Sequence, residues 1–234
     1  MQDLSLAFRT AFEMVVGRDP VLVEIVLLSL QVTLSALALA CAMGLPAGAA
    51  LAVVRFPGRR AAVALLNTLM GLPPVVVGLL VYVVLSRSGP LGFLGLLFTP
   101  TAMVIAQTLL ILPIVAALTR QVVEDLEEEM GEELRALGAG RLRRVGTLLL
   151  EGRYALATAV LAGFGRAIAE VGAVLIVGGN IAHVTRVMTT AIAMETNRGE
   201  LALALGLGIV LIGLALAVNG AAELVQRVAQ RVGA

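Results

Sequence analysis

The stretch "TPTAMVIAQTLLILPIVAAL", residues 99–118, contains no charged side chain over its whole length. A bilayer core about 30 Å thick is crossed by a helix of about 20 apolar residues, because each residue advances the helix by about 1.5 Å. This stretch is long enough and apolar enough to meet that requirement. It therefore predicts a transmembrane helix, and the rest of the chain can be compared with it.

Four further runs have the same apolar character. The chain is 59% hydrophobic and only 14% charged, whereas soluble domains average about 25% charged residues. The runs are continuous, while transmembrane strands are short and alternate between apolar and polar residues. The sequence predicts an all-α integral membrane protein with five transmembrane helices, at residues 21–43, 61–85, 99–118, 154–177 and 201–222.

The rarer residue types exclude several kinds of site. All 17 basic residues are arginines, and without lysine the phosphate-binding loop GxxxxGK(S/T) cannot exist. The single histidine, His183, excludes a multi-histidine metal site, and the single cysteine, Cys41, excludes a disulfide within the chain. The net charge of +1 gives no general attraction for nucleic acid. We expect no metal, cofactor or catalytic residue here, so ATP and Mg²⁺, if used, bind a partner chain.

The first twenty residues carry scattered charges and leave no room for the apolar core of a signal peptide. Within them, Leu4–Val16 has apolar residues at helical spacing. It is either a short helix lying on the membrane surface or a loose tail. We divide the chain into an N-terminal interfacial segment, 1–20, and a transmembrane domain, 21–234, with a charged loop at about 127–152.

Arginine is distributed unevenly between the two sides of a five-span protein. If the loop 127–152 is cytoplasmic, eleven arginines lie on that side and five on the other, while Arg166 lies inside a span. Basic residues favour the cytoplasmic side of a membrane protein. The sequence therefore predicts a multi-pass inner-membrane protein with its N-terminus outside and its C-terminus in the cytoplasm.

Prolines and glycines interrupt two of the predicted spans. "GLPPVVVG" (Gly71–Gly78) and "ILP" (Ile111–Pro113) are expected to break the helical hydrogen-bond ladder. Within a bilayer such breaks occur where neighbouring helices or a cavity satisfy the freed groups. The breaks indicate either kinks for packing or helices that line a pathway.

The segment "EEEMGEELRALGAGRLRRVGTLLLE" (Glu127–Glu151) is crowded with charges in an otherwise apolar chain. It predicts one short helix at 132–137, a turn at 138–140 and a second helix at 141–150. Leu134 and Leu137 share one predicted face, and the second helix has an apolar face of its own, formed by Leu142, Val145 and Leu149. The segment is either a knob by which a partner protein drives the membrane part, or a solvated loop whose charges set topology.

Part of this segment resembles the EAA loop of ABC-importer permeases. In "EELRALGA" (132–139), Glu132 matches the glutamate of that motif and Gly138 its glycine, whereas two alanines and a closing proline are replaced, the proline by Glu151. The resemblance implies a coupling helix that inserts into a groove on an ATPase subunit. The residues that it assigns to ATPase coupling are Glu132, Glu133, Leu134, Leu137, Gly138, Ala139 and Leu142.

Three other segments are similar to the molybdate, tungstate and sulfate permeases. They are residues 67–92, 163–181 and 185–196, and the last of them, "TRVMTTAIAMET", looks most like the tungstate branch. The resemblance implies a type I ABC-importer permease that carries an oxyanion. It also implies two cytoplasmic ATPase subunits and an external oxyanion-binding protein as partners. A second copy of the chain is expected, because five spans hardly enclose a pathway alone.

Charged and polar residues in and after the fourth span are candidates for the pathway or its gate. Arg166 and Glu170 are four residues apart and can form a structural ion pair on one helix face. Alternatively, the charge of Arg166 helps the pathway to tolerate a passing dianion. The polar segment that follows lines an outer gate, contacts a delivering protein or is solvated loop, and His183 is interpreted as an ordinary exposed or interfacial side chain. The candidates are Arg166, Glu170, Asn180, Thr185, Thr189 and Thr190.

The function that fits these features is the permease subunit of an ATP-driven importer carrying tungstate or molybdate. The alternative is an autonomous secondary transporter or channel for a small anion, which would need no cytoplasmic knob. An intramembrane enzyme is disfavoured, because the histidine and all three aspartates lie outside the predicted spans. Whether transport requires ATP separates the first two functions.

Overall fold

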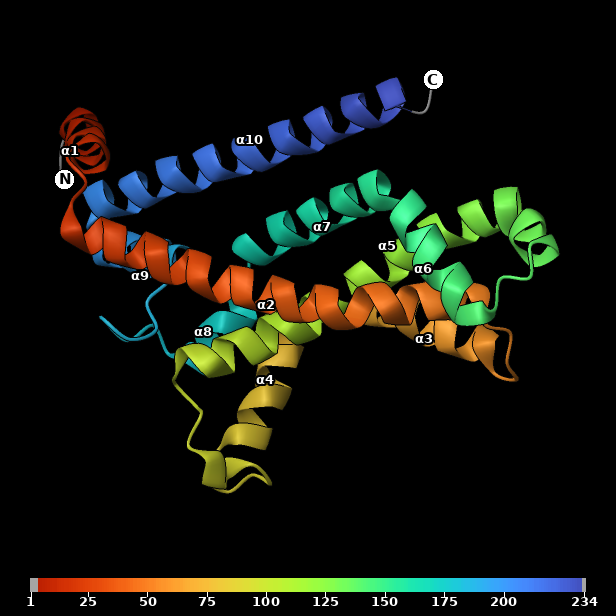
Figure 1. Ribbon diagram of the computed structural model, residues 1–234. Helices are drawn as coiled ribbons and strands as arrows, with labels where there is room; N and C mark the ends of the chain where they lie inside the picture. Colours follow the sequence, from red (N-terminus) through yellow and green to blue (C-terminus); the bar gives the residue numbers. More distant parts are fainter. Residues whose placement is uncertain (1–3, 233–234) are drawn as a thin grey trace. The chain divides into compact units, whose positions relative to one another are not determined.

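The computed structural model describes residues 4–232, and within that range the chain is built of helices (Figure 1). The elements are, in chain order, α1 (Leu4–Val16), α2 (Pro20–Val53), α3 (Arg59–Met70), α4 (Pro74–Leu85), η1 (Gly92–Leu94), α5 (Pro100–Ala136), α6 (Arg141–Glu151), α7 (Arg153–Ile168), α8 (Gly172–Gly178), α9 (Met188–Arg198) and α10 (Leu201–Val232). The all-α prediction is confirmed for the described residues. The predicted helix at Leu4–Val16 is also confirmed.

Three of these helices, α2, α5 and α10, are long and apolar enough to cross a membrane. The number rises to five if each of two bent pairs, α3 with α4 and α6 with α7, counts as one span. The helices extend beyond the predicted runs, since α2 continues to Val53 and α5 to Ala136. The structure thus contains three to five candidate spans.

The two predicted breaks have different outcomes. The break near Gly71 is confirmed, because α3 ends at Met70 and α4 begins at Pro74. At Pro113, α5 continues as one helix, and since proline has no N–H, its hydrogen-bond ladder is interrupted there without ending the helix. Ile111 and Val115, on either side of this proline, are almost completely buried, so the helix is packed both before and after the proline.

The fourth predicted span is not one continuous helix. Helix α7 ends at Ile168 and α8 begins at Gly172, so residues 169–171 form a break that the sequence reasoning missed. Glu170 lies in this break while Arg166 lies in the last turn of α7. Arg166 and Glu170 therefore do not belong to one continuous helix.

The chain forms two compact units, and α2, α5 and α10 each contribute to both. The first unit contains residues 1–35, 73–107 and 168–218. Within it, α4 packs very closely on α8, since a Cβ atom on Gly78 would lie 2.7 Å from the Cα of Ala173. The backbone N–H of Phe98 donates to the carbonyl of Val177 at 2.9 Å, which ties the start of α5 to α8.

The second unit contains residues 36–72, 108–167 and 219–234. Its helices α2 and α5 approach each other at Gly48, where a Cβ atom would lie 2.3 Å from the carbonyl oxygen of Ala116. Only glycine permits so close an approach. This contact lies on the segment of α5 that follows Pro113, so the second unit has a rigid pair of helices from which the charged loop projects.

Candidate functional site

The charged segment forms a knob made of the last turns of α5, a turn at 137–140, and α6 (Figure 1). We call the residues 127–151 the knob. The predicted second helix and the glycine turn are confirmed, but the predicted separate helix at 132–137 was wrong, because these residues complete α5. The knob is therefore continuous with a candidate membrane span.

Gly138 ends α5 by a specific backbone motif. Its φ is +73°, a left-handed conformation that favours glycine. The N–H of Gly138 donates to the carbonyl of Arg135 and the N–H of Ala139 donates to that of Leu134, both at 2.9 Å. This pair of hydrogen bonds is the Schellman motif, which satisfies carbonyls left free at a helix end. The glycine of the EAA-like stretch thus sets the direction in which the chain leaves α5.

The leucines of the knob divide into buried and exposed sets. Leu148 is completely buried with Ala49, Val53 and Val123, and Leu134, Val145 and Leu149 pack against this cluster. Leu137 and Leu142 are instead 82% and 87% exposed. The predicted pairing of Leu134 with Leu137 on one face was wrong, as was that of Leu142 with Val145. We call Leu137 and Leu142 the tip of the knob.

Glu127 and Arg144 form a buried ion pair inside the knob that the sequence analysis did not identify. Arg135 also donates to Glu127, at 2.7 Å. One turn earlier on α5, Glu124 pairs with Arg59 and Arg120. A signal for the buried pair exists in the sequence, because Arg144 precedes Leu148 by one helical turn on the apolar face of α6.

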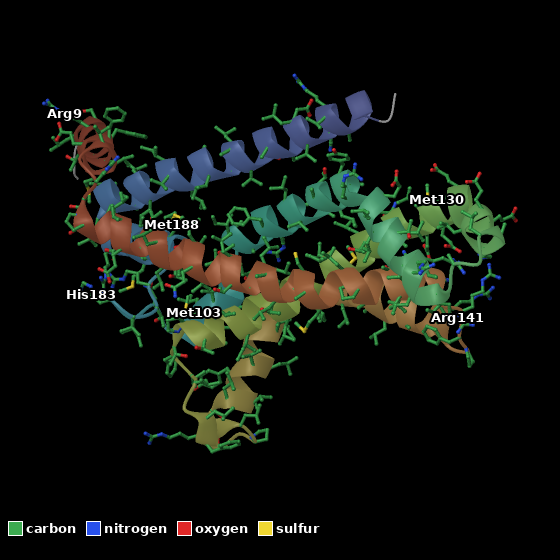
Figure 2. The ribbon with its side chains drawn as sticks, in the orientation of Figure 1. Arg9, Met103, Met130, Arg141, His183 and Met188 are labelled. Atoms are coloured by element: carbon green, nitrogen blue, oxygen red, sulfur yellow. The ribbon has the colours of Figure 1, made fainter. Side chains whose placement is uncertain are left out.

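The other predicted coupling residues of the knob lie at or near its surface. Glu132 and Glu133 are exposed, with Ala139 half-buried beside Gly138 in the turn. Figure 2 shows Met130 and Arg141 on the two helices that flank this turn. The knob therefore presents three leucines, Leu137, Leu142 and Leu150, and several carboxylates to its surroundings above an apolar core.

The polar candidates after α8 form a buried network instead of a solvated loop. Thr190 donates to the Asn180 side-chain oxygen at 2.9 Å, and Thr185 donates to the carbonyl of Gly178 at 2.5 Å. Thr189 donates to the carbonyl of Glu170 at 2.7 Å. All four side chains are at most 7% exposed. The network fixes the connection between α8 and α9.

Glu170 is buried at the start of α8. Its Oε1 accepts the N–H of Ala173 at 3.2 Å, which satisfies one of the free donors of the helix N-terminus. Glu170 also lines a small cavity of about 10 Å³, together with residues that include Ser29, Thr33 and Thr189. Arg166, in contrast, is exposed at the end of α7. The contacts of Glu170 are typical of a structural residue.

Two further ionic contacts belong to the segment after α8. The Glu195 carboxylate, only 5% exposed, lies 3.5 Å from Arg186 and 3.4 Å from Arg198. His183 is exposed, as expected, and its Nδ1 lies 2.9 Å from Glu24. Among residues 4–232, no group of three or more histidine, cysteine, aspartate or glutamate side chains has the spacing to hold a metal ion.

Residues 44–230 match the model of a family described as the binding-protein-dependent transport system inner membrane component. The chain belongs to this family. Its members are type I ABC permeases. The EAA-like stretch and the knob both lie within the matched residues, so the family match extends over the candidate site.

Several curated relatives of this permease cover most of its length. The tungstate uptake system permease protein TupB of Peptoclostridium acidaminophilum is 42% identical over 219 residues, which are 94% of this chain and 96% of the relative. A probable anion ABC transporter permease protein of Haloferax volcanii is 43% identical, covering 85% of this chain and 88% of the relative. The molybdenum transport system permease protein ModB of Escherichia coli K12 is 29% identical, with 76% and 82% covered.

Proposed function

We propose that this chain is the membrane subunit of an ATP-driven importer that carries tungstate, or the similar oxyanion molybdate, across the inner membrane. The relatives named for tungstate uptake support the oxyanion class. We propose tungstate before molybdate, because the molybdenum permeases are less similar to this chain than the tungstate permeases are. The autonomous secondary transporter is not favoured, because the relatives are permeases of ABC systems.

The observation that carries the proposal is the tip of the knob. Leu137 and Leu142 are exposed, whereas Leu148 is buried and Leu134 packs against the cluster around it. Large apolar side chains held outward by a packed core are typical of a surface that a partner covers. An ATPase subunit that encloses the tip would gain apolar contacts and would push on α5, a candidate membrane span.

The proposal includes three kinds of partner. Two copies of the chain would enclose the pathway, two ATPase subunits would each hold one knob and bind ATP with Mg²⁺, and an external binding protein would deliver the oxyanion. The knob and the C-terminus would lie in the cytoplasm and the N-terminus outside, as arginine distribution favours. Closure of the ATPases on ATP would switch the pathway between inward-open and outward-open states.

The candidate residues receive different roles in this proposal. Glu132, Glu133, Leu137 and Leu142 would contact the ATPase, while Gly138 and Ala139 would shape the turn. Arg166, exposed at the end of α7, would tolerate the passing dianion. The buried contacts of the other candidates support a role in holding the path in place; these residues are Glu170, Asn180, Thr185, Thr189 and Thr190.

The test is uptake into proteoliposomes that contain the chain and its ATPase. The binding protein and tungstate or molybdate are placed outside, ATP is sealed inside, and elemental analysis measures the metal taken up. We expect uptake only with hydrolysable ATP, and Leu142→Asn should weaken ATPase binding and uptake together. Uptake that proceeds equally without ATP would refute the proposal in favour of a secondary transporter.

Phe93→Asn is the matched control for the tip variant. Phe93 is 81% exposed, close to the value for Leu142, but lies in η1, in the loop between α4 and α5, on the proposed outer side. Its replacement removes a similar exposed apolar area without touching the knob. ATPase binding should therefore be unchanged in this variant. Equal weakening by both variants would show that general loss of apolar surface, and not the tip, is responsible.

A further inference from the structure

Glu127 lies where α5 meets α6 and is approached there by two arginines. Arg144 of α6 is ion-paired with its Oε1, and Arg135, near the end of α5, lies 2.7 Å from the same oxygen. The side chains of Glu127 and Arg144 are 12% and 10% exposed, whereas that of Arg135 is 51% exposed. The carboxylate therefore has one buried partner and one solvent-accessible partner.

The buried pair joins the two helices of the knob directly. Arg144 precedes Leu148 by one turn of α6, and Leu148 is completely buried in the cluster that includes Val123 of α5. Removing one partner of a buried ion pair leaves a charge without compensation, which is strongly unfavourable. Movement of α6 away from α5 would therefore have to separate both the apolar contacts and the pair.

The pair also has hydrogen-bonding capacity that it does not use. Within the described residues, Oε2 of Glu127 and Nε of Arg144 are both buried without a hydrogen-bond partner. Arginine and a carboxylate can form two parallel bonds through these atoms. Here Arg135 shares Oε1, so removal of Arg135 leaves Glu127 free to bond Arg144 more completely. The two arginines are consequently not equivalent.

We propose that Glu127 is a positioning residue for coupling, which acts through Arg144 to hold α6 at one angle to α5. This angle sets the separation and direction of Leu137 and Leu142, the tip that the ATPase is proposed to hold. Force applied at the tip then moves α5 without bending the knob. The inference rests on the proposed function, because it assigns Glu127 and Arg144 a part in the same coupling surface.

The first measurement follows the angle between the two helices without requiring transport. Spin labels are placed on cysteines at the exposed positions Glu129 and Arg143, in a Cys41→Ala background. We expect one narrow distance distribution in the parent and a broad one in Glu127→Gln and in Arg144→Gln. An unchanged distribution in both variants would overturn the proposal, whatever the outcome of the uptake assay.

The second measurement is oxyanion transported per ATP hydrolysed by the complete complex. A positioning role predicts that Glu127→Gln and Arg144→Gln assemble with the ATPase but lower this ratio about tenfold. Arg144→Lys, which keeps the charge, should recover part of it, and Arg135→Gln should lower it much less than Arg144→Gln. A smaller amount of complex with a normal ratio would show a folding role only and overturn the proposal.

Glu223→Gln is the control for both measurements. Glu223 pairs with Arg227 at 3.1 Å on the exposed surface of α10, where the two side chains are 57% and 67% exposed. The substitution removes the same charge from an ion pair, but one that is screened by solvent. Both the distance distribution and the transport ratio should match the parent.

Discussion

Gly78 of α4 and Ala173 of α8 are in such close contact that a Cβ atom on the glycine would lie 2.7 Å from the Cα of the alanine. The same added atom would lie 3.1 Å from the carbonyl oxygen of Ala173. Both distances involve backbone atoms, which cannot move aside as a flexible side chain does. Small residues at helix contacts let the backbones of membrane helices approach closely, and this contact packs α8 on α4 after the break at residues 169–171.

Gly78→Ala should therefore destabilise the protein. Forcing the two helices apart is an overpacking substitution, which costs about 1–3 kcal/mol. Thermal unfolding in detergent, followed by circular dichroism, measures the change. Gly213→Ala is the control, because no neighbouring segment of residues 4–232 lies within 4 Å of its added Cβ, and alanine there should leave the unfolding temperature the same or higher.

Gly138→Ala should weaken the turn of the knob. Its φ of +73° places an added side chain in the left-handed region, which costs about 1–2 kcal/mol for residues other than glycine. The affinity of the chain for its ATPase, measured by titration in nanodiscs, should fall. Gly140→Ala is the control two residues away, since its φ is −65° and space is open around it. A fall of equal size in both variants would contradict the role of the left-handed turn.

Thr185→Val should destabilise the connection between α8 and α9. The Thr185 hydroxyl donates to the carbonyl of Gly178 and accepts the N–H of Ile181 at 3.0 Å, and the side chain is 1% exposed. Valine has the same shape but leaves both groups buried without this partner, at a cost of about 1–3 kcal/mol. Hydrogen exchange of the amide of Ile181 should increase. In Thr68→Val, whose hydroxyl is exposed on α3, the unfolding temperature should stay within experimental error.

Glu195→Gln should destabilise the protein. The carboxylate is 5% exposed and lies close to Arg186 and Arg198, and the Arg186 side chain is only 17% exposed. Loss of the negative charge leaves the Arg186 charge poorly compensated, which costs about 3 kcal/mol. Equilibrium unfolding by denaturant gives the value. A loss no greater than that of the exposed-pair variant Glu223→Gln would disprove the importance of burial here.

Features that depend on neighbouring residues in the chain were predictable. The helices follow from uninterrupted apolar runs, and the helix at Leu4–Val16 follows from its spacing. The turn at Gly138 is a local backbone requirement that glycine meets and other residues do not. The resemblance to oxyanion permeases also rests on short motifs, and the family match agrees with it.

Features that depend on packing between distant segments were not predictable from local patterns. Pro113 appears in the sequence as a helix breaker, yet α5 continues through it, and Ile111 and Val115 are buried on either side. No proline lies at the break between α7 and α8, so the local sequence does not predict it. At this break Glu170 accepts a hydrogen bond from the first turn of α8, a helix that the sequence pattern does not separate from α7.

The sequence by itself determined that the chain is helical and has apolar runs long enough to span a membrane. It also determined that a charged segment contains a turn at Gly138. Only the tertiary structure decided which side chains of that segment are available to a partner. Leu134 and Leu137 have equal apolar character in the sequence, but the cluster around Leu148 accommodates the first and leaves the second exposed. Glu127 and Arg144 likewise become partners only because α6 folds back on α5, since burial and ion pairing across 17 residues are set by packing and not by local propensity.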